Sequence, residues 1–139
     1  MATRSTIAMK TEDGIYSVYC HWDGYVEHNG RILLNHYTDT ALVKALIDLG
    51  DLSTLSESLD DVQAYHRNKG EEWADVSPQT FSDVPEWIEL AQGIEFFYLW
   101  NGKEWLVSTG QKVNGYPTFE FVEVAILEQL VEEFQEKLG

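Results

Sequence analysis

The sequence predicts a single α+β domain spanning residues 1–139, with an antiparallel sheet of about four strands from two hairpins and helices packed on one face. Three observations predict this fold. Apolar, β-branched and aromatic segments flank turn signals at residues 4–22 and again at 94–108. Several other segments carry apolar residues at helical spacing. A chain of 139 residues suits one domain.

The first hairpin is predicted from an alternating segment, a turn and a second strand. Residues 4–10 place Ile7 and Met9 on one face, and Gly14 closes the turn with a positive φ. Residues 15–22 form the second strand. Its period of two predicts a core face made of Tyr16, Val18, Cys20 and Trp22.

Two helices follow, over residues 26–37 and 40–49. Gly30 within the first costs about 1 kcal/mol relative to alanine, which indicates a close packing contact. Thr38 or Asp39 caps the second helix, and Gly50 follows its end.

The middle of the chain, residues 51–93, has weaker signals. Residues 59–67 fit a short helix or a strand, and residues 69–78 fit a loop. A helix is predicted to begin near Asp83, with Pro85 in its first turn, and to end before Gly93.

The second hairpin has the strongest local signal. Asn101-Gly102 lies between apolar segments 94–100 and 103–108, a pattern that predicts a type I′ turn. A long amphipathic helix is then predicted over residues 121–138. Its water-facing side carries Glu128, Glu132, Glu133 and Glu136.

The charge is strongly negative and unevenly spread. Nine basic residues face 24 acidic ones, for a net charge of −15. Residues 1–50 hold four Lys/Arg and six Asp/Glu, so residues 51–139 hold five and eighteen. Such a field repels phosphate, which argues against direct nucleic-acid binding. It serves solubility, or it complements a basic groove on a protein partner.

The sequence also bears on compartment. Cys20 is the single cysteine, so no internal disulfide forms and a reducing interior is expected. The first residues show no signal-peptide pattern, and no segment approaches the length of a membrane span. We therefore expect a cytoplasmic protein without a membrane partner.

Part of the first 50 residues resembles a known family. The matching pieces are TRSTIA at 3–8, YCHWDGY at 19–25, EHNG at 27–30, the leucine pair at 33–34 and HY at 36–37. They resemble a family of small, mostly uncharacterised proteins of bacteriophages and prophages. The resemblance implies a phage setting and a bacterial cytoplasm, but no mechanism.

Two groups of candidate site residues emerge. An acidic partner-binding set surrounds Trp73, an aromatic that either anchors an interface or folds back onto the core. Besides the four glutamates of the C-terminal helix, this set comprises Asp60, Asp61, Glu71, Glu72 and Asp75. A second set lies in the N-terminal motif and comprises Arg4, His21, Asp23, Tyr25, Glu27 and His28.

No catalytic residue, cofactor or metal is predicted. The chain has no HExxH or CxxC pattern, and His28 and His36 are too far apart for adjacent ligation. Cys20 falls on the expected core face, with His21 on the opposite face of the strand. We expect His21 and Asp23 to hydrogen-bond locally at the corner after the strand.

These observations lead to an expected function. A phage-encoded acidic interaction protein would bind a basic surface on a host complex, inhibiting or redirecting it by nucleic-acid mimicry. Anti-phage defence, including CRISPR, belongs to this class of target. One alternative is a protein that sequesters a nucleotide or other small molecule, with Arg4 and the aromatic residues around a base. A metal-dependent enzyme is the other alternative.

Overall fold

The described residues are built around one mixed β-sheet. The structure is a computed structural model and describes residues 2–91, 93–109, 112–113, 116–117 and 122–123. Seven strands lie side by side in the order β10-β7-β6-β1-β2-β3-β4, and β5 adds to β2 off this path. The bounds are β1 Ser5–Thr11, β2 Gly14–Cys20, β3 Leu52–Thr54, β4 Gln63–Ala64, β5 Gln79–Phe81, β6 Phe96–Trp100, β7 Trp105–Ser108 and β10 Val122–Glu123. Lys112–Val113 (β8) and Tyr116–Pro117 (β9) form a separate two-stranded sheet.

Both predicted hairpins are present. Thr11 pairs with Gly14 at the end of the β1–β2 ladder, and Gly14 has the expected positive φ of 129°. The second turn differs from the prediction, because Trp100 pairs with Trp105 and leaves a four-residue loop. A type I′ turn needs positive φ at both central residues, whereas here Gly102 has one and Asn101 does not. The Asn101 side chain instead accepts hydrogen bonds from the backbone N–H groups of Lys103 and Glu104, both at 2.9 Å.

The expected antiparallel sheet of about four strands is wrong. The two hairpins join through a parallel pairing of β1 with β6, in register from Ser5↔Phe96 to Met9↔Trp100. Further strands from the middle of the chain occupy the outer edge of β2. There β5 pairs antiparallel with residues 15–17, and β3 pairs parallel at Cys20. The parallel pairings make the sheet mixed.

The predicted helices of the first two-thirds of the chain form. Segment 26–37 is a π-helical turn, η1 (Val26–Gly30), that continues into α1 (Arg31–His36). Thr40–Ile47 form α2, capped by Asp39, and Val84–Leu90 form α4, capped by Asp83. Segment 59–67 contains β4, and a short helix, α3 (Trp73–Val76), interrupts the predicted loop at 69–78.

The predicted C-terminal helix falls largely beyond what can be compared. Val122–Glu123, at its expected start, form the edge strand β10 beside β7. Residues 124–138 lie outside the described residues. The four glutamates assigned to that helix, Glu128, Glu132, Glu133 and Glu136, therefore lie outside them too.

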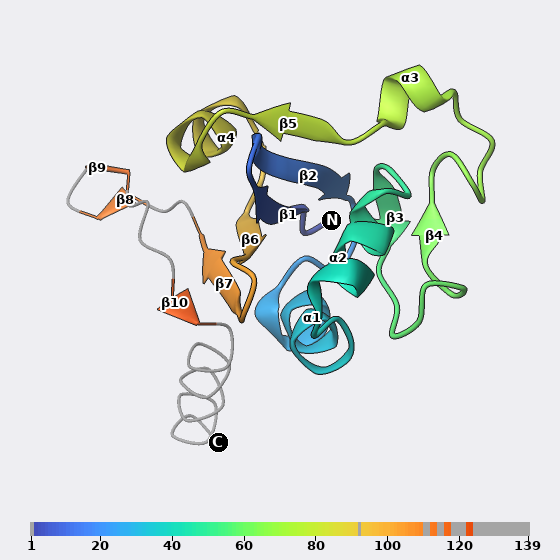
Figure 1. Ribbon diagram of the computed structural model, residues 1–139, viewed down its shortest axis with the longest axis horizontal. Helices are drawn as coiled ribbons and strands as arrows, with labels where there is room; N and C mark the ends of the chain where they lie inside the picture. The colour runs from blue at the N-terminus through green and yellow to red at the C-terminus, as the bar shows by residue number, and fades with distance from the viewer. Residues whose placement is uncertain (1, 92, 110–111, 114–115, 118–121, 124–139) are drawn as a thin grey trace.

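Helices cover both faces of the sheet, which corrects the prediction that they cover one. On the first face, Ile7 and Met9 of β1 belong to a core that includes Leu33 of α1 and Leu46 of α2. On the opposite face, Ala8 belongs to a second core with Trp87 of α4. Figure 1 shows α4 beside β5, away from α1 and α2. A central strand buried on both sides reads as a nearly continuous buried run, as β1 does.

Strand β2 is buried on both of its faces, whereas the sequence predicted only one core face. Val18 and Cys20 are buried in the first core, and Tyr16 packs against it. Ile15, on the other face, is also buried, in the second core with α4. Trp22 lies beyond the end of β2 and is 42% exposed, so its assignment to the core was wrong.

Candidate functional site

The N-terminal motif residues lie at or beside the corner between the end of β2 at Cys20 and the start of η1 at Val26. Asp23 has a φ of 58°, and among the residues that the structure describes no other non-glycine has a positive φ. The backbone N–H of Gly24 donates to the carbonyl of Thr3 at 2.8 Å. A side chain at Gly24 would meet Ser5 and the Thr3 carbonyl at 2.8 Å, so glycine is needed there.

Asn29, which the sequence did not single out, holds this corner together. Its side chain is fully buried, and its amide nitrogen donates to the Ser5 hydroxyl and the Trp22 carbonyl, both at 3.3 Å. Its side-chain oxygen lies 2.9 Å from Nδ1 of His28. A buried amide with satisfied donors stabilises one backbone arrangement. No sequence pattern indicated this role, because it depends on Ser5, which is 24 residues away in the chain and meets Asn29 only in the folded protein.

The corner divides the predicted motif site into two parts. Arg4 and His21 line an open hollow of about 410 Å³ with Trp22 and Glu95. Tyr25 and His28 are in contact elsewhere, with ring centroids 6.0 Å apart. The expected His21–Asp23 contact is replaced by a 2.5 Å hydrogen bond between His21 Nδ1 and the Tyr19 hydroxyl. The six predicted residues therefore share a corner of the chain and do not converge on one point.

Metal ligation and thiol chemistry are the two kinds of chemistry that the described residues bear on. Within the part of the chain that the structure covers, no group of three or more His, Cys, Asp or Glu side chains is placed to hold a metal ion. His36 faces Glu57, with Nε2 and Oε1 3.9 Å apart, and His28 lines the same groove. Burial raises the pKa of the Cys20 thiol to about 11, which leaves it protonated at neutral pH.

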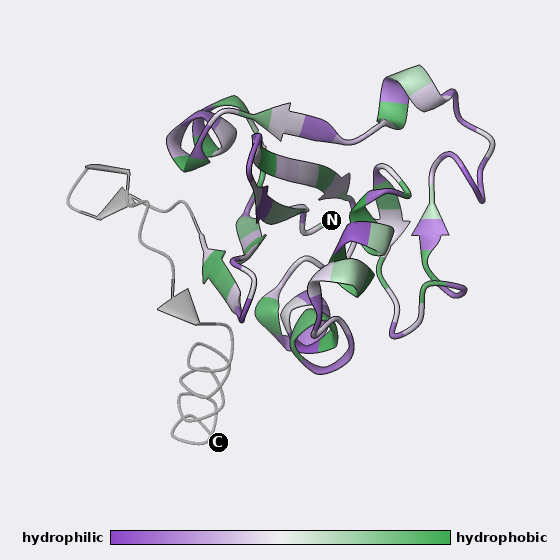
Figure 2. Cartoon of the chain, in the orientation of Figure 1, coloured by the Kyte–Doolittle hydropathy of each residue, from purple (hydrophilic) through white to green (hydrophobic). Residues whose placement is uncertain are grey.

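Five predicted carboxylates lie along the β4 edge of the sheet. Asp60 and Asp61 precede β4, and Glu71, Glu72 and Asp75 follow it; all five are exposed. We call residues 57–75 the acidic edge. It holds six acidic residues, including Glu57, and two basic ones. Figure 2 shows mainly hydrophilic colours between β4 and α3.

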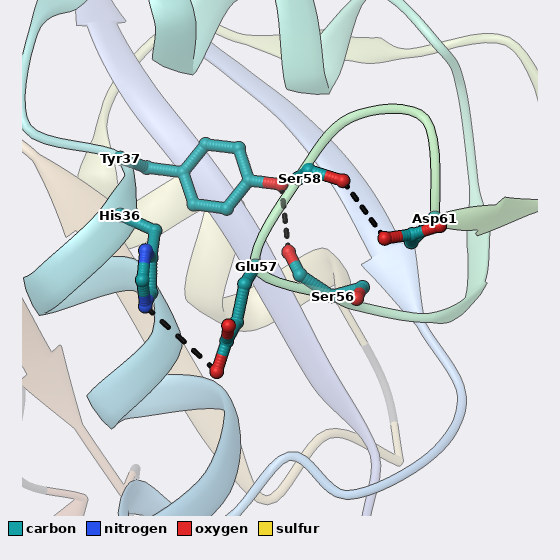
Figure 3. A network of polar contacts seen from close by, with 6 residues as sticks. All are labelled: His36, Tyr37, Ser56, Glu57, Ser58 and Asp61. Atoms are coloured by element: carbon teal, nitrogen blue, oxygen red, sulfur yellow. Dashed lines mark hydrogen bonds and ion pairs between the residues drawn. The ribbon is translucent and has the colours of Figure 1, made fainter.

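The first half of the acidic edge is tied to α1. Tyr37 is buried, and its hydroxyl donates to the Ser56 carbonyl at 2.8 Å. Ser58 donates to Asp61 Oδ2 at 3.0 Å, and Glu57 reaches towards His36, as Figure 3 shows. The loop that presents Asp60 and Asp61 is thus held by contacts at its base.

The second half is held by backbone hydrogen bonds around Asp51. The Asp51 N–H donates to the Val76 carbonyl at 2.7 Å, and the Tyr65 N–H donates to the Asp51 carbonyl at 3.1 Å. Glu71 N–H donates to the Tyr65 carbonyl at 3.0 Å. Val62, Ala64 and Val76 are buried beneath these bonds. The carboxylates consequently stand on a fixed frame.

Arg67 contributes to this frame with its guanidinium. The Nη2 group donates to the carbonyls of Leu59 at 2.9 Å and Val62 at 2.6 Å. Its Nε donates to the side chain of Asn68 at 3.1 Å. These guanidinium hydrogen bonds go to carbonyl and amide oxygens. Among the described residues, Arg67 forms no ion pair with a carboxylate of the acidic edge.

Trp73 lies within the acidic edge and is 42% exposed. Its ring meets His66 edge-on, with centroids 5.2 Å apart. It also lies against Gly50, where an added Cβ would sit 3.1 Å from the ring. The ring thus shares features of both alternatives, because it packs against the chain at Gly50 and stays partly exposed among the acids.

No helix among the described residues is long and apolar enough to cross a membrane. Comparison of the chain with family models, with curated proteins and with solved structures finds no match in any of the three.

Proposed function

We propose that this chain is a phage-encoded acidic interaction protein that docks through the acidic edge onto a basic surface of a host protein complex. Bound there, it inhibits or redirects the complex by occupying a site made for nucleic acid. Complexes of anti-phage defence, such as CRISPR effectors, are the class of target we favour. The phage and host setting of this proposal is the one that the resemblance of residues 3–37 to phage proteins implies.

One observation carries this proposal: the carboxylates of the acidic edge stand on a hydrogen-bonded frame with an exposed tryptophan among them. A backbone that is already ordered loses little conformational entropy on docking, and the field of the carboxylates speeds association with a positively charged partner. Tryptophan is among the residues that most often dominate binding energy at interfaces. Arg67 supports the frame and leaves the carboxylates to face outward.

The test is a pull-down with the tagged full chain from a bacterial lysate, followed by affinity measurement with the captured complex. Two variants with equal loss of charge are compared with the wild type. The first, Glu71→Gln/Glu72→Gln/Asp75→Asn, acts on the acidic edge. The second, Glu12→Gln/Glu89→Gln/Glu104→Gln, removes three exposed carboxylates from the β1–β2 turn, α4 and the β6–β7 loop.

We expect the acidic-edge variant to bind at least about 10-fold more weakly, and the matched control to bind nearly as well as the wild type. Trp73→Ala should also weaken binding at least about 10-fold. Higher salt should weaken the wild-type complex, and the bound chain should compete with the partner's own nucleic acid. Equal losses in the two charge variants, or simultaneous binding of chain and nucleic acid, would contradict the proposal.

A further inference from the structure

A second site, which Asp51 lines, lies between β2, β5 and α4. It is a cavity of about 220 Å³. One wall is polar and includes Ser17, Tyr19 and Asp51, while the other is apolar and includes Phe81 and Leu90. Leu90 is 57% exposed, which leaves an apolar side chain at the surface beside the cavity. A concave site with one apolar wall and a few polar groups is the usual form of a small-molecule pocket.

Asp51 is the charged group of this cavity. Its Oδ1 accepts a hydrogen bond from the backbone N–H of Tyr19 at 2.9 Å. Among the residues that the structure describes, no Lys, Arg or His lies within ion-pair distance of it. Burial, opposed in part by this hydrogen bond, raises the pKa of the Asp51 carboxyl to about 6. A partly buried carboxylate without a cation is costly, and proteins usually supply a partner for it.

The polar wall is ordered without a ligand. The Trp87 indole donates to the Thr6 hydroxyl at 3.2 Å, and that hydroxyl donates to the Val18 carbonyl at 3.0 Å. Ser17 donates to the Gln79 carbonyl at 3.4 Å, near the upper limit for a hydrogen bond. These bonds join α4 to β1 and β5 to β2, so the cavity keeps its shape around Asp51.

We propose that this cavity binds a small organic cation, a primary ammonium or an amidinium, whose charged end pairs with Asp51 and whose short apolar body lies against Phe81 and Leu90. The volume equals that of about seven waters, which limits the ligand to the size of a fragment. This proposal can be tested apart from the docking function, because the carboxylates varied there do not line the cavity and Asp51→Asn leaves them unchanged.

The titratable groups around Asp51 bear on the pH dependence. Tyr19 of β2 and Tyr65 after β4 face it, and burial raises the pKa of both phenols, so they stay neutral near pH 7. Glu71 is the nearby acid, and Arg4 and the buried Cys20 lie close to Tyr19. Binding of an ammonium ion should weaken as the pH falls below about 6, because Asp51 then loses its charge while the ligand keeps its own.

The experiment measures thermal shifts and calorimetric binding of the full chain with benzylammonium, n-butylammonium and benzamidinium at about 10 mM, a concentration that detects millimolar fragments. Benzyl alcohol serves as the neutral match for benzylammonium. Asp51→Asn tests the carboxylate, and Asp60→Asn, on the exposed acidic edge, is the matched control.

We expect at least one cation to raise the melting temperature of the wild type and of Asp60→Asn. Benzyl alcohol should not do so, and Asp51→Asn should bind the cation at least about 10-fold more weakly. Asparagine can still accept the Tyr19 hydrogen bond, so this variant should unfold cooperatively. Equal shifts with benzyl alcohol, undiminished binding by Asp51→Asn, or no shift with any of the three cations would overturn the proposal.

Discussion

The buried side chain of Asn29 and the partly buried side chain of Asp51 have opposite effects on the stability of the fold. Asn29 is neutral, lies in the core, and has hydrogen-bond partners for both its amide nitrogen and its oxygen. Asp51 is an acid with a single hydrogen bond to its carboxylate. The first group therefore stabilises the corner, whereas the second opposes folding whenever it is charged.

The pKa of Asp51 predicts how stability depends on pH. Its pKa in the folded state, about 6, lies above its usual value of 3.8, so the folded state binds the proton more tightly. The charged carboxylate therefore destabilises the fold fully above pH 6, and this effect disappears as the pH falls towards 4. We expect Asp51→Asn to raise the free energy of unfolding at pH 7 by about 1 kcal/mol, a value reduced because the side chain keeps partial contact with water.

Urea unfolding of wild type and Asp51→Asn at a series of pH values checks this prediction. The difference between the two proteins should shrink between pH 6 and pH 4, because the carboxyl of Asp51 takes up its proton over this range in the folded state but not yet in the unfolded state, where its pKa is 3.8. Other groups titrate equally in the two proteins and cancel in the difference. A difference that stayed constant over this range would show that the carboxylate charge is not the cause.

At the scale of the elements, short sequence patterns predicted where helices and hairpins form, but not which strands pair across long stretches of the chain. The helix starts near Asp39 and Asp83 could be predicted because the capping hydrogen bond of each spans only three residues. The parallel pairing of β1 with β6 joins residues about 90 positions apart, and neither strand records its partner. Strands β3 and β4 have three and two residues, too short for a periodic pattern.

The candidate sites also divide into features set by neighbouring residues, which the sequence predicted, and features set by distant ones, which it did not. The exposure of the acids around Trp73 could be predicted, because charged side chains in a polar segment usually face solvent. Asp51 was missed because it is one acid among many, and its burial depends on β2, β5 and α4 meeting around it. Trp22 was misplaced because β2 ends at Cys20, before the alternation reaches it.

Helix α4 allows a test of an element and its cap. Asp83 Oδ1 accepts a hydrogen bond from the Glu86 N–H at 2.9 Å, and the Glu86 carboxylate in return accepts the N–H of Ser82 at 2.5 Å. Asp83→Ala should lower the free energy of unfolding by about 1 kcal/mol, and Asp83→Ser should recover most of it. Urea denaturation measures both, and equal losses in the two variants would contradict a capping role.

At the scale of the whole molecule, the net charge of −15 opposes compaction by self-repulsion. The described part of the chain concentrates this repulsion at the acidic edge, where six acids and two bases fall within 19 residues and Arg67 faces backbone carbonyls. Repulsion between like charges falls with distance and with screening. Neighbouring carboxylates should therefore contribute more of it than dispersed ones.

This concentration predicts a difference between two proteins of equal net charge. Raising NaCl from about 0.02 M to about 0.5 M shortens the screening length and should raise the melting temperature of the wild type. Glu71→Gln/Glu72→Gln/Asp75→Asn should begin at a higher melting temperature and gain less from salt. Glu12→Gln/Glu89→Gln/Glu104→Gln should stay closer to the wild type, because its three carboxylates lie on separate elements. Differential scanning calorimetry across the salt series gives the comparison. Identical salt responses of the two variants would mean that only the net charge of the chain matters. The claim that the repulsion is concentrated at the acidic edge would then be wrong.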